Sequence, residues 1–185
     1  AYHPFIGGAE VAVKEITDRL PDYDFEVVSA DIKSFWSKYF YPVWAYRRAV
    51  RQHGAKNYHL IWAIMANQAG MAAASFKRRF PTVPFLLTLQ EGDDLESFAY
   101  RARLLGPRLW GVFRRADHLT AISSYLARWA KQMGACAPIS VVPNGVDLGK
   151  FKTQNEKRKA TTQNFKTIIT TSRLVKKNGV DTLIE

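Results

Sequence analysis

The sequence predicts an α/β fold in which helices cover a parallel sheet on both faces, the doubly wound arrangement. Segments with the apolar spacing of a helix alternate along the chain with short apolar runs typical of strands. These runs are continuously apolar, as expected of parallel strands covered on both faces. At 47% hydrophobic and 23% charged residues, the 185-residue chain has the composition of an ordinary globular protein.

Strands are expected where short apolar runs are bounded by turn residues. They cover residues 25–32, 58–64, 84–89, 118–122, 139–142 and 166–171. Pro143-Asn144-Gly145 closes the run at 139–142, and such a sequence is typical of a tight turn.

Helices are expected between these strands. They cover residues 9–20, 33–52 and 67–80, a segment that begins at Asp93, a segment that ends near Arg115, the residues after Ser123 and those from Gly179 onward. The apolar residues of the first helix fall on one face, and Pro21 ends it. Pro42 predicts a break in the second helix, and Ser123 is a candidate N-cap.

A change in composition near residue 150 indicates a domain boundary. Residues 1–149 are expected to form one α/β domain, residues 150–164 a polar linker, and residues 165–185 the incomplete start of a second domain. Both ends are expected to be truncated, because the chain starts without Met at Ala1 and stops at Glu185 inside an expected helix.

The formal net charge of +11 favours binding to the phosphates of nucleotides, anionic lipids or nucleic acids, without choosing among them. Cys136 is the single cysteine, so no internal disulfide can form and a reducing compartment is favoured. No apolar run is long enough for a transmembrane helix.

Gly7 and Gly8 directly precede the first expected helix, and Glu10 lies in its first turn. Two glycines at this point would let a phosphate or another ligand group approach the backbone, and a helix N-terminus supplies free N–H groups. A plain turn is the alternative.

Polar residues follow the expected strand 84–89 directly, at Gln90, Glu91 and Asp93. Ligands bind outside the carboxyl ends of the strands in open α/β sheets, so these residues are candidates for binding the hydroxyl groups of a ligand. The alternative is a strand-to-helix loop in which Asp93 is the N-cap.

Arg173 and Lys177 follow the last expected strand and precede Gly179 and a helix. This order suits a cradle for a diphosphate, and a solvated basic loop is the alternative. No metal is expected, because the histidines have no ligand spacing and Asp22-Tyr23-Asp24 precedes a strand instead of following one. No cofactor is expected either.

Residues 33–51 and 98–115 combine aromatic side chains with Lys and Arg. Such segments suit the surface of an anionic membrane, and they also suit single-stranded nucleic acid. The alternative is that the aromatic side chains are core and the cations form a solvated face.

Four segments in this order resemble the motifs of glycosyltransferase family 4: its glycine-rich loop, its strand-and-serine segment, its interdomain signature and the opening of its donor-binding domain. They are residues 4–10, 116–123, 142–151 and 172–184. The resemblance covers essentially the whole chain.

The resemblance implies a GT-B architecture, of which this chain is the N-terminal half: a Rossmann-like, acceptor-side domain and the start of the donor-binding domain. It also implies retention of anomeric configuration and no catalytic metal. Gly7 and Gly8 would approach the donor phosphates, and Arg173 would neutralise the leaving diphosphate. Lys177 would take the part of a lysine that the family commonly has one position later. Asn144 and Gly145 would lie in the interdomain segment.

Glu10, Gln90, Glu91 and Asp93 are expected to contact the sugar or the acceptor, and no catalytic residue is assigned. Gln90 departs from the family pattern, which often has His at that position. A second departure is Asn178, where the family commonly has Lys. The family's carboxylate motif would lie beyond Glu185.

The sequence therefore predicts a hexosyltransferase-type enzyme, part of a longer protein and inactive as this fragment alone. It would move a sugar from a nucleotide-diphosphate sugar to a lipid-linked or polysaccharide acceptor in cell envelope polysaccharide biosynthesis. It is expected in the cytoplasm, peripheral on the inner face of the membrane, with no specific nucleic acid. The alternatives are a non-catalytic module that binds nucleic acid or an anionic surface, and a sugar-nucleotide epimerase.

Overall fold

The computed structural model describes residues 8–29, 35–90 and 107–145, without the side chains of residues 35–39 and 107–110. The chain divides into two compact units, Ala1–Val146 and Asp147–Glu185. The second unit lies outside the described residues, as do the expected linker and the strand at 166–171. The division into an acceptor-side domain, a linker and a donor-binding domain therefore stays a prediction.

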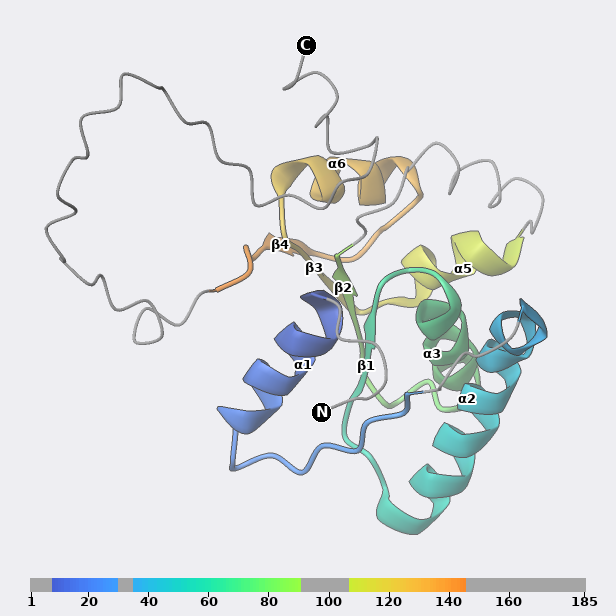
Figure 1. Ribbon diagram of the computed structural model, residues 1–185. Helices are drawn as coiled ribbons and strands as arrows, with labels where there is room; N and C mark the ends of the chain where they lie inside the picture. Colours follow the sequence, from blue (N-terminus) through green and yellow to red (C-terminus); the bar gives the residue numbers. More distant parts are fainter. Residues whose placement is uncertain (1–7, 30–34, 91–106, 146–185) are drawn as a thin grey trace, which may run out of the picture. The chain divides into compact units, whose positions relative to one another are not determined.

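A four-stranded parallel sheet forms the centre of the first unit (Figure 1). Its strands, in spatial order, are β1 (Ile61–Ile64), β2 (Phe85–Leu89), β3 (His118–Ala121) and β4 (Ile139–Val141). In the register of the central strands, Leu87 pairs with Ala63 on one side and with Leu119 on the other. The predicted α/β class with a parallel, Rossmann-like sheet is confirmed.

The described helices are α1 (Gly8–Asp18), α2 (Phe35–Lys56), α3 (Gln68–Arg79), α5 (Pro107–Arg115) and α6 (Ser124–Gln132). The strands follow one another in spatial order, and crossovers between parallel strands are right-handed, so α3, α5 and α6 pack on one face of the sheet. Helix α2 packs on the outer side of α3 (Figure 1).

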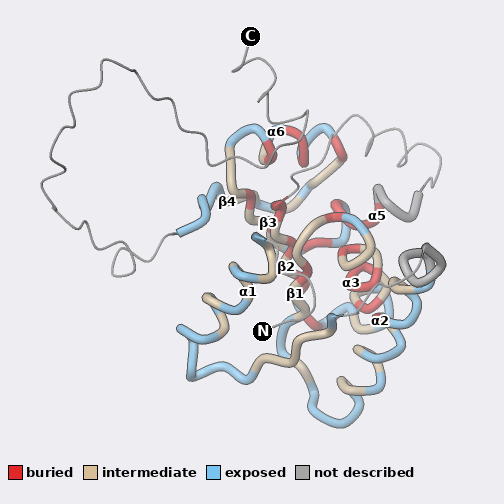
Figure 2. Tube along the Cα trace, viewed as in Figure 1, coloured by how far each residue is buried: buried red, intermediate tan, exposed pale blue. Residues whose placement is uncertain are grey.

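One apolar cluster joins that face of the sheet to the helices (Figure 2). Side chains alternate along β2, so Phe85, Leu87 and Leu89 are fully buried while Leu86 and Thr88 are half-buried. From the helices, Phe113 meets the edge of the Trp129 ring with 5.3 Å between centroids. The predicted N-cap is also confirmed, because the Leu126 N–H donates to Ser123 Oγ at 3.2 Å.

Two predictions about the first fifty residues are wrong. Residues 25–29 form no strand, and they are tied to neighbouring elements by side chains: the hydroxyl of Tyr41 donates to the Val28 carbonyl at 3.0 Å. Helix α2 also continues through Pro42 without a break. Proline removes one backbone hydrogen bond, and the packing of α2 against α3, which buries Ala45, outweighs that loss.

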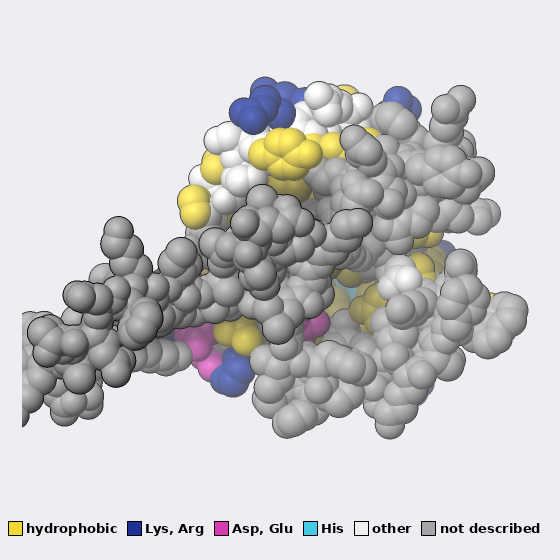
Figure 3. Space-filling view, turned by 45° about the horizontal axis from the view of Figure 1, so that its top comes forward, with side chains coloured by type: hydrophobic (Ala, Val, Ile, Leu, Met, Phe, Trp, Pro, Cys, Tyr) yellow, Lys and Arg dark blue, Asp and Glu magenta, His cyan; other side chains and the backbone are white. Residues whose placement is uncertain are grey.

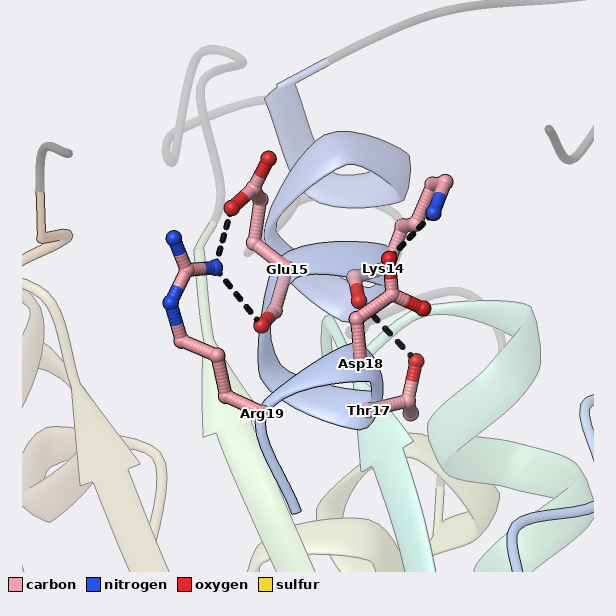
Figure 4. Close-up of polar contacts among 5 residues, drawn as sticks. All are labelled: Lys14, Glu15, Thr17, Asp18 and Arg19. Carbon is pink, nitrogen blue, oxygen red and sulfur yellow. Dashed lines mark hydrogen bonds and ion pairs between the residues drawn. The ribbon is translucent and has the colours of Figure 1, made fainter. Parts of the chain in front are cut away.

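Helix α1 forms where it was predicted. Its polar side chains form hydrogen bonds and ion pairs with residues three and four positions away (Figure 4). Lys14 pairs with Asp18, Arg19 pairs with Glu15, and the Thr17 hydroxyl donates to the Lys14 carbonyl at 3.1 Å. Such exposed pairs contribute about 0.3–0.5 kcal/mol each. No residue of α1 is buried, and Ala12 and Val13 are half-buried, so these local contacts add to light packing.

Candidate functional site

The carboxyl ends of the parallel strands meet at one edge of the sheet, where ligands bind in open α/β folds. At this edge β1 leads into Met65, β2 into Gln90, β3 into Ser123 and β4 into the turn at Asn144 and Gly145. We call it the carboxyl edge. The hydrogen bonds to β2 extend one residue past the ends of β1 and β3, because the Met65 N–H donates to the Thr88 carbonyl and the Ile122 N–H to the Leu89 carbonyl.

Gln90 is the buried polar side chain of this edge, with 9% of its surface exposed. Its side-chain amide forms no hydrogen bond with any of the described residues. A buried amide without a partner costs about 1–3 kcal/mol, and native proteins leave few of them. A ligand with hydroxyl groups would provide the missing donors and acceptors.

A row of polar side chains crosses the sheet just before Gln90. The Trp62 indole N–H donates to Thr88 Oγ1 at 2.8 Å, and that oxygen lies 2.7 Å from Thr120 Oγ1. Alternation along β2 places Gln90 on the same face as Thr88, opposite the apolar cluster. The hydroxyls in the row have partners, whereas the amide at the end of the strand has none among the described residues.

Backbone strain also marks this edge. Met65 has φ 71°, a left-handed conformation that costs a non-glycine residue about 1–3 kcal/mol. The backbone of Gly70 packs closely against this residue, since a Cβ on Gly70 would lie 3.1 Å from the Met65 oxygen and 2.8 Å from Val112 Cγ1. Sequence reasoning missed Met65. The pattern that could have indicated it is a short strand joined to a helix of small residues by a turn that contains no glycine.

Asn67 is a second residue that sequence reasoning did not single out. It occupies the N-cap position of α3, yet its side chain caps no helix N–H and instead lies 3.7 Å from the Met65 sulfur. The first N–H groups of a helix lack intrahelical partners. The β1–α3 turn therefore presents backbone donors at the same edge as Gln90.

Only some of the predicted site residues lie in the described part of the chain. Gly8 opens α1, and Glu10 lies half-buried in its first turn, where a carboxylate interacts favourably with the helix dipole. A Cβ on Gly8 would meet nothing within 4 Å, so the described contacts do not require glycine there. Asn144 and Gly145 are exposed beyond β4. The other predicted residues fall outside the described ranges: Gly7, Glu91, Asp93, Arg173 and Lys177.

The opposite, amino edge of the sheet holds an ion pair. Lys77 Nζ lies 2.8 Å from Asp117 Oδ2, and the same carboxylate oxygen accepts the Phe85 N–H at 2.7 Å. Burial raises the pKa of Asp117, but the hydrogen bonds from Lys77 and Phe85 and the Lys77 charge outweigh it and hold that pKa below its usual value. Lys77 also donates to the Pro81 and Val83 carbonyls, so this cluster is a structural latch.

A second perturbed pair precedes β1. The Tyr58 hydroxyl donates to Glu26 at 2.5 Å, which lowers the pKa of Glu26, while burial and the Glu26 carboxylate raise the pKa of Tyr58. Lys56 lies 3.2 Å from the same carboxylate. This pair joins the segment before α2 to the start of β1, away from the carboxyl edge. Among the described residues, the perturbed pKa values of these carboxylates and of Tyr58 therefore mark structural contacts, and the candidate site is recognised by the Gln90 amide, which has no hydrogen-bond partner among those residues.

Charged side chains are visible at two places on the face shown in Figure 3. In the view of Figure 3, Lys and Arg side chains lie at the upper margin of the described surface, and the acidic side chains lie lower, beside a basic one. In the described residues, no cluster of His, Cys, Asp or Glu could hold a metal ion. No described helix is long and apolar enough to cross a membrane.

These features define an α/β protein of the class that binds its ligand at the carboxyl ends of parallel strands. The family model of Glycosyltransferase Family 4 matches residues 26–150, well over half of the chain, and the chain belongs to this family. The family membership gives it glycosyltransferase activity, with a sugar donor and an acceptor as substrates. No curated protein matches the chain.

Proposed function

We propose that the chain is the acceptor-side half of a retaining, metal-independent hexosyltransferase. It would move a sugar from a nucleotide-diphosphate sugar onto a lipid-linked or polysaccharide acceptor in cell envelope polysaccharide biosynthesis. The single observation that carries the proposal is the buried amide of Gln90, which has no hydrogen-bond partner among the described residues of a family 4 chain. No metal or organic cofactor is needed for this reaction.

The chemistry of Gln90 limits its role. A side-chain amide offers donors and an acceptor but takes no proton at neutral pH. Gln90 would therefore orient a hydroxyl group of the donor sugar or of the acceptor, and general-base catalysis must come from another group. Glu91 and Asp93 follow it directly in sequence, and we propose that they contact the same ligand, together with Glu10.

The phosphates of the donor need positive groups. We propose that Gly7 and Gly8 let the diphosphate approach the backbone at the start of α1, and that Arg173 and Lys177 neutralise the charge that develops as the diphosphate leaves. Asn144 and Gly145 would form the turn that leads to the donor-binding domain. The lone cysteine supports a cytoplasmic setting, on the inner face of the membrane.

The test is a screen of sugar nucleotides with the complete gene product, measuring release of nucleoside diphosphate and transfer to acceptor. We expect one donor to react, with Gln90→Leu about tenfold slower, because a hydrogen bond to the ligand is lost. Arg173→Ala should abolish the reaction. Gln132→Leu, the same change at an exposed residue of α6, is the matched control and should stay at the rate of the unmodified protein.

Two results would contradict the proposal. Full activity of Gln90→Leu would remove Gln90 from the ligand site. Silence across all donors, with oligonucleotide binding intact, would favour a non-catalytic binding module instead.

A further inference from the structure

An exposed row of residues runs along α2, at the three- and four-residue spacing that places side chains on one side of a helix. We call it the α2 stripe, and it consists of Phe40, Val43, Trp44, Arg47, Arg48 and Arg51. The apolar members come first and are well exposed, at 66% for Phe40, 50% for Val43 and 42% for Trp44. The stripe is about 16 Å long at 1.5 Å per residue.

The rest of α2 is occupied by contacts with the protein. Ala45 is buried, Tyr41 donates to the Val28 carbonyl, and the His53 ring lies 4.4 Å from the Phe80 ring. These side chains attach the helix to α3 and to residues 25–29. Exposed residues recur along α2 on its remaining side (Figure 2), so the stripe lies on the exposed side of a helix that packs against α3.

The cationic half of the stripe is largely uncompensated. The sequence of α2 contains no Asp or Glu. Among the described residues no ion pair engages Arg47 or Arg51, and Glu26 is shared between Lys56 and the more distant charge of Arg48. An open hollow of about 550 Å³ lies along this half, and its described lining is Trp44, Arg47, Arg48, Arg51, Gln52 and Ala55.

We propose that the α2 stripe is a docking surface for an anionic lipid bilayer. Phe40, Val43 and Trp44 would enter the interface between headgroups and acyl chains, and the three arginines would meet lipid phosphates. This proposal rests on the proposed function and identifies the surface by which the proposed glycosyltransferase would contact the membrane. It does not depend on catalysis, so the two can fail separately.

Lipid fits the stripe better than single-stranded nucleic acid does. Nucleic acid needs open aromatic faces for base stacking, interleaved with cations. Here the Arg48 guanidinium lies over the Trp44 ring, 5.5 Å from its centroid, and the Tyr41 ring lies 6.0 Å away. Apolar and cationic residues are also separated along the axis, and Val43 offers nothing to a base. That separation matches the layers of a bilayer surface.

The experiment measures sedimentation of the full 185-residue chain with vesicles of phosphatidylcholine alone or mixed with phosphatidylglycerol. We expect binding to the mixed vesicles only. The double variant Arg47→Gln/Arg51→Gln should bind about thirtyfold more weakly, because each basic residue near an anionic surface contributes about 1 kcal/mol. The control Arg128→Gln/Lys131→Gln makes the same charge change at exposed positions of α6 and should lose less than threefold.

A second variant tests the apolar half. Phe40→Gln keeps all charges, and we expect it to abolish the part of the binding that survives high salt, because salt screens the arginines but not apolar insertion. Circular dichroism checks that each variant is folded. Equal losses of vesicle binding in the α2 and α6 double variants would show that binding depends on net charge alone and would overturn the proposal. Absence of vesicle binding, with tight oligonucleotide binding lost in Arg47→Gln/Arg51→Gln, would assign the stripe to nucleic acid.

Discussion

The two edges of the sheet differ in how completely their polar groups are satisfied. At the amino edge, Lys77 and Asp117 bind each other, two loop carbonyls and a strand N–H. At the carboxyl edge, Gln90 is buried without a partner in the described chain, and Met65 holds a left-handed backbone conformation. Both edges belong to the same strands, so sheet geometry alone does not explain the difference.

This difference in hydrogen bonding distinguishes polar groups that stabilise the fold from polar groups that can bind a ligand. A satisfied buried network adds stability, whereas an unsatisfied group costs stability unless a ligand completes it. Enzymes commonly carry such a cost at their sites. Mutations at the amino edge should therefore change stability, and mutations of Gln90 should change activity.

The largest loss of stability is expected from Lys77→Met. The change removes the cation that Asp117 pairs with and leaves the Pro81 and Val83 carbonyls without the Lys77 donor, while Asp117 keeps the Phe85 N–H, so we expect the free energy of unfolding to fall by about 2–3 kcal/mol. Urea unfolding measures it, with Arg78→Met, an exposed neighbour, as the control within about 0.5 kcal/mol. A similar small effect for both variants would show that the latch does not stabilise the sheet.

The next largest effect tests packing at the carboxyl edge. In Gly70→Ala the new methyl would lie 2.8 Å from buried Val112 and 3.1 Å from the Met65 oxygen, and such overpacking costs about 1–3 kcal/mol. Gly54→Ala in α2 meets nothing within 4 Å and should gain up to about 1 kcal/mol from helix propensity. Thermal unfolding of the two variants should move in opposite directions, and a shared direction would contradict the close contact at Gly70.

The Asp117 carboxylate should make stability depend on pH. Its pKa is lower in the folded protein than in the unfolded chain, so its contribution is present above the unfolded pKa and is lost as pH falls through the folded pKa. Because 47% of the side chain is exposed, solvent screening limits the contribution to about 1 kcal/mol. Unfolding of the unmodified protein and of Asp117→Asn should differ at pH 7, and the two should converge only as the pH falls from about 4, the ordinary aspartate pKa, through the lower folded pKa. A constant difference across this range would reject the assignment.

The smallest change in stability is expected from Gln90→Leu, even though the residue is buried. Leucine removes an amide that has no partner in the described part of the chain and keeps an apolar volume in its place, so stability should stay within about 0.5 kcal/mol or rise. The same variant is expected to lose activity in the transfer assay. If urea unfolding shows that the variant loses more than about 2 kcal/mol of stability, Gln90 forms a structural hydrogen bond. Its role would then be to stabilise the fold, as Lys77 and Asp117 do at the amino edge.

Much of the fold was predicted from local sequence. The alternation of helical and strand segments predicted β1 to β4 and the helices between them. Ser123 was identified as an N-cap because serine directly before an apolar helical face is a preferred capping residue. The position of Gln90 at a strand end could also be predicted, since it follows β2 directly.

Sequence by itself determined the class of the protein, the order of its elements and the residue types at the strand ends, because these depend on periodicity and on neighbours along the chain. Only the tertiary structure decided that residues 25–29 stay out of the sheet, that α2 continues through Pro42, and that Met65 is held in a left-handed conformation. The same holds for Gln90, whose burial, and whose lack of a partner among the described residues, depend on what surrounds it in space. Long-range contacts fix each of these, and no local pattern records which groups a side chain will meet.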